Sequence, residues 1–178
     1  MSDSNLHVLI GADEIQARVQ EMAAQIDSDY AGRGPIYMLC VLKGAILFFS
    51  DLARAVRHPV RMDFIGISSY GKGKTSSGEV KLTKDLDYSI EGYDILVVED
   101  ILDSGNTLSY LIKVLQQRHP KSVRIATLLD KPERRARPVE VDYVGFAIPD
   151  KFVVGYGLDF DEDYRQLRDI CVLDGPTA

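Results

Sequence analysis

Three carboxylates followed by a run of small polar residues form the part of the sequence best suited to chemistry. Glu99, Asp100 and Asp103 come directly after an apolar run, and residues 104–107 (Ser-Gly-Asn-Thr) follow them. A glycine-containing link that opens a helix presents backbone N–H groups that can bind a phosphate. Carboxylates beside such a site repel phosphate unless they face sugar hydroxyls or a divalent cation. The ligand that fits this pattern is a phosphorylated sugar with a diol.

The residues on either side of these acids predict a strand and a helix. Residues 95–98 (Ile-Leu-Val-Val) are apolar without alternation, which is typical of a central strand of a parallel sheet covered on both faces. After Thr107 the apolar spacing becomes that of an amphipathic helix, with Leu108, Leu111, Ile112 and Leu115 on one stripe. Because neighbouring strand residues point to opposite faces, Glu99 and Asp100 need not act as an acid dyad.

A purely structural interpretation of the same stretch stays open at this point. Asp103 could simply cap a turn between a buried strand and a helix. The stretch also lacks the Gly and Lys spacing of a Walker A loop and is not a GxGxxG turn.

The rest of the chain repeats the strand–turn–helix unit. A first amphipathic helix carries Ile15, Val19, Met22 and Ile26, and a strand over 36–42 leads through Lys43-Gly44 into a second helix. Further strands are expected over 60–68, 123–129 and 143–148. Serial units of this kind predict a doubly wound, mostly parallel α/β sheet flanked by helices. Ligands collect at the carboxyl ends of such strands, so Lys43 and the acids should share one rim.

Length, composition and charge narrow the class of protein. The 178 residues predict one domain over 1–178, and the formal net charge of −6 argues against non-specific nucleic-acid binding. The sequence begins polar and has no 18-residue apolar run, so a cytoplasmic protein without a membrane partner is expected. Cys40 and Cys171 indicate reduced, buried thiols, although a bridge between them stays open. The three histidines are isolated, which gives no zinc-type cluster.

Residues 97–107 (Val-Val-Glu-Asp-Ile-Leu-Asp-Ser-Gly-Asn-Thr) resemble the phosphoribosyl-pyrophosphate (PRPP) motif of type I phosphoribosyltransferases, in detail the hypoxanthine/guanine branch. The resemblance implies the type I fold, with a small hood over the active site formed by terminal segments, including a strand at 170–173. It also implies purine salvage, in which hypoxanthine or guanine and PRPP give IMP or GMP and pyrophosphate. A homodimer or homotetramer is the assembly implied.

The resemblance assigns a PRPP site residue by residue. Glu99 and Asp100 would order the ribose hydroxyls and a Mg²⁺ ion, and Asp159 would lie near a pyrophosphate-bound Mg²⁺. The 5′-phosphate and pyrophosphate contacts would come from Ser104, Gly105, Asn106, Thr107, Lys43, Gly44 and Arg165. Some relatives carry Lys where Asn106 stands, so backbone N–H and hydroxyl groups would hold the phosphate here. The bond between Leu42 and Lys43 is often cis in relatives, which the sequence does not reveal.

The purine site is likewise implied by the resemblance. Lys131 would donate to the carbonyl at purine position 6, which selects hypoxanthine or guanine over adenine. Phe152 would stack on the base, the backbone of Val153 would read its edge, and Asp159 completes the site. Asp103 would accept the proton from purine N7 as the general base. Without the resemblance, Lys131 reads as part of a solvated loop and Phe152 as a core residue.

Ser69 and Tyr70 begin a stretch rich in Gly, Ser and Lys. By composition residues 69–78 are a linker or hairpin tip. The resemblance implies instead a loop that closes over the active site and keeps water from a cationic transition state.

Three other functions share part of the pattern. A regulator that binds PRPP without turnover would keep the acidic motif but would not need Lys43-Gly44, Lys131 and Phe152 together. A receiver-type phosphorelay domain would explain the acids but not the Ser-Gly-Asn-Thr turn. A xanthine/guanine phosphoribosyltransferase is the closest alternative within the enzymes, separable by offering xanthine.

Overall fold

The computed structural model describes residues 5–69 and 80–175. Tyr70 therefore lies outside the described residues, and only the backbone of Ser69 is described, so the expected lid stays a prediction. Within these ranges the strands form two sheets, one of six strands and one of three.

The larger sheet has the order β4-β3-β2-β5-β6-β7. Its strands are β2 (Ile36–Leu42), β3 (Val60–Ser69), β4 (Val80–Lys84), β5 (Asp94–Leu102), β6 (Ser122–Asp130) and β7 (Tyr143–Ala147). All pairings are parallel except that of β4 with β3, which is antiparallel. The expected mostly parallel sheet is thus confirmed. The edge strand β4 was not predicted, because it is short and only partly buried.

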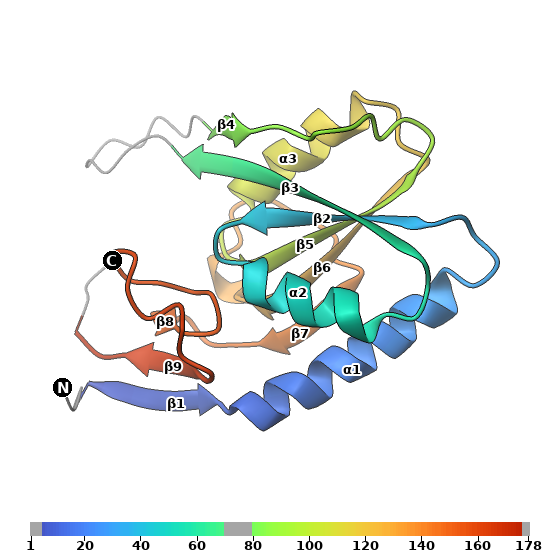
Figure 1. Ribbon diagram of the computed structural model, residues 1–178. Coiled ribbons are helices and arrows are strands. Elements are labelled where there is room, and N and C mark those ends of the chain that lie inside the picture. Colours follow the sequence, from blue (N-terminus) through green and yellow to red (C-terminus); the bar gives the residue numbers. More distant parts are fainter. Residues whose placement is uncertain (1–4, 70–79, 176–178) are drawn as a thin grey trace.

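Helices cover both faces of this sheet, as a doubly wound fold requires (Figure 1). The helices α1 (Ala12–Asp29) and α2 (Ile46–Ala55) pack on one face, and α3 (Asn106–Gln116) packs on the other. Residues 95–98 of β5 are fully buried and supply alternate side chains to the two faces. This double burial explains why the apolar run does not alternate.

A smaller sheet brings the two ends of the described chain together. It consists of β1 (Leu6–Ile10), β9 (Ile170–Leu173) and β8 (Val153–Val154), in the antiparallel order β1-β9-β8. The small sheet lies on the side toward which the arrows of β2 and β3 point, which is the carboxyl edge of the large sheet (Figure 1). The strand β9 was expected, whereas β1 and the two-residue β8 were not.

Both cysteines are buried and free. Burial raises the pKa of the Cys40 thiol to about 12, so this thiol is a core group rather than a reactive one. Among the described helices, none has the length and apolar character needed to cross a membrane.

Candidate active site

The acid pair Glu99 and Asp100 lies at the carboxyl end of β5. Glu99 is only 9% exposed, and its Oε1 accepts a hydrogen bond from the backbone N–H of Asp100 at 3.2 Å. Burial raises the pKa of both carboxyls, and the neighbouring Asp100 charge raises that of Glu99 further. In the described ranges neither carboxylate has an ion-pair partner. Although strand geometry separates their faces, the two acids interact, and the pair would favour a cation or hydroxyl donors.

One glycine backbone is packed against this acid pair, and a second glycine is packed against the first. A Cβ atom on Gly44 would overlap the Asp100 carboxylate, and one on Gly157 would overlap the Gly44 carbonyl oxygen. The peptide bond between Leu42 and Lys43 is cis. The segment of Lys43 and Gly44 therefore lies at the same rim as the acids, as the topology predicted.

Lys43 and Arg165 come together next to these glycines through acidic partners. Arg165 Nη1 donates to the Gly157 carbonyl oxygen at 2.7 Å, and Nη2 lies 3.0 Å from Asp159 Oδ1 and 3.3 Å from Glu162 Oε1. Lys43 Nζ lies 2.8 Å from the other oxygen of Glu162. The charge of Arg165 lowers the pKa of Asp100 in opposition to burial, so this cation faces the acid pair. Arg165 thus lies beside the acid pair, and Glu162 links it to Lys43.

The loop between β5 and α3 has the form expected of a phosphate site. Gly105, the N-cap residue of α3, has a φ of +82°, and a Cβ there would lie 2.7 Å from the Arg137 carbonyl oxygen. The Ser104 carbonyl accepts the N–H groups of Ala136 and Arg137 at 2.9 and 3.1 Å, which fixes the loop. The first turn of α3 carries no acidic residue. Its backbone N–H groups are therefore suited to an anion.

Asn106 and Thr107 begin that first turn. Asn106 Oδ1 accepts a hydrogen bond from Arg137 Nε at 3.0 Å, and its backbone N–H faces Ser104 Oγ at 3.4 Å. Thr107 is half-buried beside them. The four residues 104–107 are thus gathered in one turn, as predicted.

Asp103 and Lys131 are connected by a chain of charges. Lys131 is 5% exposed, and its Nζ lies 3.9 Å from Asp150 Oδ1. Arg134 lies between Asp150 and Asp103, with Nη1 3.3 Å from Asp150 Oδ1 and Nε 3.1 Å from Asp103 Oδ1. The proposed base and the proposed purine-binding lysine therefore face one region. Mixed charge in a loop was the one sequence feature that marked Arg134 and Asp150, and it does not predict a site.

Phe152 and Val153 lie where the small sheet meets this region. The ring of Phe152 packs edge-on against Phe160, with 5.7 Å between centroids and an interplanar angle of 89°. Phe152 also packs on the apolar cluster of the small sheet. The core interpretation of this residue is thus supported, and its stacking on a purine stays a prediction.

The fit of a magnesium ion can be tested on the donor set. Mg²⁺ is usually bound by one or two carboxylates together with substrate oxygens. Glu99 and Asp100 supply two unpaired carboxylates, which fits such a shared ion. Within residues 5–69 and 80–175 no three acidic, His or Cys side chains gather into a metal site. Asp159 is instead bound to Arg165 and to the Glu162 N–H, so its part in metal binding stays a prediction.

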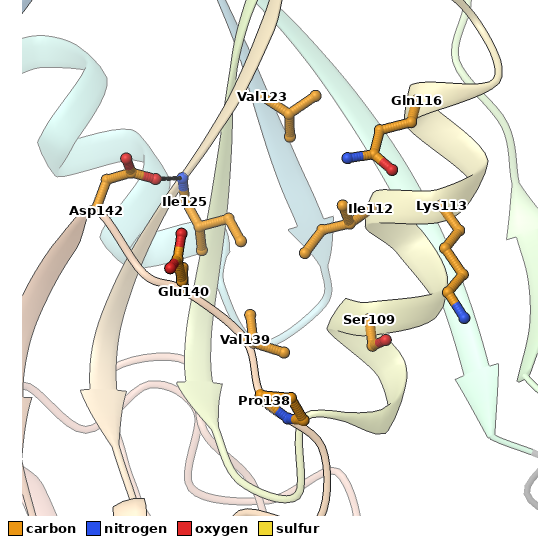
Figure 2. A pocket seen from close by; sticks show the side chains of 10 residues that line it. All are labelled: Ser109, Ile112, Lys113, Gln116, Val123, Ile125, Pro138, Val139, Glu140 and Asp142. Atoms are coloured by element: carbon orange, nitrogen blue, oxygen red, sulfur yellow. Dashed lines mark hydrogen bonds between the residues drawn. The ribbon is translucent and has the colours of Figure 1, made fainter.

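A groove of the described surface lies elsewhere. It has a volume of about 400 Å³ and runs between α3 and residues 138–142 (Figure 2). Ile112, Val123 and Ile125 form its apolar floor, and the Asp142 carboxylate accepts the Ile125 N–H at its edge. No predicted site residue lines this groove, so the candidate site is the sheet rim and not this hollow.

Known proteins resemble this chain over most of its length. A family model described as "Phosphoribosyl transferase domain" matches residues 11–161. The hypoxanthine-guanine phosphoribosyltransferase of Bacillus subtilis is 52% identical over 166 residues, covering 93% of this chain and 92% of that protein. A crystal structure of a hypoxanthine phosphoribosyltransferase from Staphylococcus aureus has a TM-score of 0.89 and 46% identity, covering 94% of this chain and 90% of that one.

Longer proteins also contain a similar region. The "Bifunctional protein TilS/HprT" of Listeria monocytogenes is 52% identical over 166 residues, which cover 93% of this chain but 26% of that protein. The chain thus spans about a quarter of the length of these bifunctional relatives.

Proposed function

Because the chain belongs to the phosphoribosyl transferase domain family, we propose that it is a hypoxanthine-guanine phosphoribosyltransferase of purine salvage. In this reaction hypoxanthine or guanine reacts with PRPP to give IMP or GMP and pyrophosphate. The proteins of that name which match this chain over 85% or more of their length support this branch of the family, with identities of 49% and 52%.

One observation carries the proposal: a buried acid pair lies directly before an amide-rich helix N-terminus. The N–H groups at the start of α3 suit the 5′-phosphate, and Glu99 and Asp100 suit the ribose hydroxyls. The Gly44 backbone lies against Asp100. No residue with a side chain could approach so closely. A receiver-type domain would need the acids alone and not this combination.

The leaving group would be held on the opposite side of the acid pair. We expect Lys43, Gly44 and Arg165 to bind pyrophosphate, since two cations and the Gly44 backbone meet there. Glu99 and Asp100 would hold a Mg²⁺ ion shared with the substrate. When bound, that ion would neutralise the pyrophosphate charge and favour its departure.

The purine would lie between Asp103 and Lys131. Lys131 would donate to the 6-oxo group, and Asp103 would accept the proton that N7 loses as N9 attacks the ribose. The negative charge of Asp103 also suits the positive charge that develops on the ribose. Phe152 and the backbone of Val153 would position the base. Arg134 must leave Asp103 Oδ1 accessible for this proton transfer.

A spectrophotometric assay tests the proposal. The purified protein would be mixed with PRPP, magnesium and, one at a time, hypoxanthine, guanine, xanthine and adenine. We expect turnover of hypoxanthine and guanine but not of adenine, whose amine is mismatched to Lys131. A clear preference for xanthine would indicate a xanthine/guanine enzyme. If no purine is ribosylated while PRPP binds, the protein is a PRPP-binding regulator.

Family membership also leads us to propose a single domain over residues 1–178 that acts as a cytoplasmic homodimer or homotetramer. Light scattering on the eluate of a gel-filtration column would measure the assembly.

A further inference from the structure

One carboxylate of the described structure contacts both cations that would bind pyrophosphate. Glu162 Oε2 lies 2.8 Å from Lys43 Nζ, and Glu162 Oε1 lies 3.3 Å from Arg165 Nη2. Lys43 and Glu162 are 119 residues apart in the sequence, so only the fold brings them together. Each oxygen of this carboxylate therefore accepts from a different cation, as two oxygens of a pyrophosphate would.

The turn that presents Glu162 has an unusual backbone. Asp161, Glu162 and Tyr164 have φ values of +53°, +72° and +74°, a region that residues with side chains seldom adopt. The Glu162 N–H donates to Asp159 Oδ2 at 2.9 Å, and the backbones of Phe160 and Asp163 exchange hydrogen bonds at 3.2 and 3.0 Å. These bonds hold the turn in a conformation that brings the Glu162 carboxylate to the two cations.

We propose that Glu162 competes with pyrophosphate for Lys43 and Arg165 and thereby limits the affinity of the site for pyrophosphate. The inference rests on the proposed function and adds a residue that the reaction scheme does not use. Carboxylate and phosphate oxygens accept from the same N–H donors, so the cations cannot serve both fully. Glu162 and Lys43 are 64% and 66% exposed, and ion pairs this exposed are weak enough to be displaced. Glu162 thus binds the cations between turnovers and favours release of the product.

A positioning role for Glu162 predicts the opposite change in pyrophosphate affinity. If the carboxylate served mainly to position Lys43 and Arg165 for the ligand, its removal would weaken pyrophosphate binding. Competition instead requires that its removal strengthen binding. Asp159 retains its 3.0 Å contact with Arg165 in either case, so the change reports on Glu162.

Calorimetric titration of pyrophosphate with magnesium into the full chain distinguishes these roles. We expect Glu162→Gln and Glu162→Ala to bind pyrophosphate roughly 3- to 10-fold more tightly than the unmodified protein, as expected for ion pairs made by an exposed carboxylate. The matched control is Asp163→Asn, which removes the same charge from the same turn. The Asp163 side chain makes no ion pair within the described residues, so its removal should leave affinity unchanged.

Each other result has a distinct meaning. Unchanged or weaker binding by both Glu162 variants would overturn the competition. An equal gain in Asp163→Asn would also overturn it, because local charge and not the bridging contact would then be responsible. Failure of the unmodified protein to bind pyrophosphate would refute the proposed function itself. A steady-state readout should agree, with stronger product inhibition by pyrophosphate in the Glu162 variants.

Discussion

Asp103 is the residue on which the proposed proton transfer depends. Its side chain is 41% exposed, and Oδ1 lies 3.1 Å from Arg134 Nε. We expect Asp103→Asn to lower kcat by roughly 10²–10⁴-fold, the usual effect of losing a general base, while the KM for PRPP stays near its original value. Steady-state kinetics with hypoxanthine and PRPP varied in turn would measure this separation.

Asp150→Asn is the control for this substitution. Asp150 Oδ1 accepts a hydrogen bond from Arg134 Nη1 at 3.3 Å. Loss of this carboxylate therefore disturbs the arginine but leaves the proposed base in place. A fall in kcat of equal size in both variants would assign the effect to the charge network of Asp150, Arg134 and Lys131 and not to Asp103 as the base. Near-normal turnover in Asp103→Asn would remove Asp103 from the role of base.

Lys131 allows a second prediction, because it is nearly inaccessible to water and, among the described residues, its Nζ has an ion-pair partner only in Asp150, at 3.9 Å. Loss of a charged donor to the 6-oxo group should cost about 1.5–3 kcal/mol of binding free energy, or about 10- to 100-fold in purine affinity. Lys131→Ala should leave PRPP affinity almost unchanged. Calorimetric titration of each ligand would measure both, with the exposed Lys151→Ala as the control. Equal losses for purine and PRPP would contradict the assigned contact.

The residues of the site differ in how far the sequence could reveal them. Asp103, Glu99 and Asp100 lie within one motif, so their spacing carries information. Glu162 contacts Lys43, and Arg134 contacts Asp103. In both pairs the two residues lie far apart in the sequence. Nothing in a single sequence specifies such pairs, because only the completed fold brings the segments together.

At the scale of elements, the loop between β5 and α3 depends on a left-handed glycine. Gly105→Ala would place a Cβ in a left-handed backbone and 2.7 Å from the Arg137 carbonyl oxygen. We expect the free energy of unfolding to fall by about 1–3 kcal/mol and PRPP affinity to fall with it. Urea denaturation and calorimetric titration of PRPP would measure the two effects.

Gly92 offers a matched control for the glycine substitution. It has a similar φ of +74°, but a Cβ there would have no neighbour within 4 Å. Gly92→Ala should therefore show the backbone penalty alone, with normal PRPP affinity. If the two variants lost equal stability and both bound PRPP, the close contact at Gly105 would have no effect on stability or on PRPP affinity.

Strands and helices were predictable where burial leaves a regular spacing of apolar residues in the sequence. The run in β5 and the stripe of α3 follow from packing on both faces of one sheet, and both were found. The strands β1, β4 and β8 were missed, because they are short and lie in the small sheet or at a sheet edge. Their pairing comes from tertiary context, which local periodicity does not encode.

Across the whole molecule, buried carboxylates serve opposite purposes at the two edges of the large sheet. Asp94, the first residue of β5, accepts a hydrogen bond from Ser122 Oγ at 2.6 Å and lies 3.4 Å from Lys121 Nζ. Burial alone would raise its pKa, but these partners and Arg33 hold the pKa below its usual range. At the other end of the same strand, Glu99 has a raised pKa and no ion-pair partner within the part of the chain that the structure describes. The amino edge is thus stabilised by charge, whereas burial disfavours the charge of the acid pair at the carboxyl edge.

The pH dependence of stability follows from this contrast. A carboxyl whose pKa is lowered on folding stabilises the protein above its unfolded pKa of about 3.9, and that contribution is lost as the pH falls through the folded pKa. We expect Asp94→Asn to lower the free energy of unfolding at pH 7 by about 1–3 kcal/mol, the usual effect of losing charged hydrogen bonds. Thermal unfolding would be followed from pH 7 to pH 3. The difference in Tm between Asp94→Asn and the unmodified protein should become smaller as the pH falls.

Glu99→Gln is the matched variant. It removes a carboxylate from the same strand, but one whose pKa is raised and not lowered in the folded protein. A carboxyl whose pKa is raised on folding destabilises the folded state as the pH rises from its unfolded value through the folded one. Glu99→Gln should therefore raise the Tm at pH 7 in the absence of magnesium, while losing activity. Removing a charge would then stabilise the protein at one end of β5 and destabilise it at the other. A lower Tm in both variants would mean that burial of Glu99 imposes no electrostatic cost, and that the acid pair is part of the framework and not of the site.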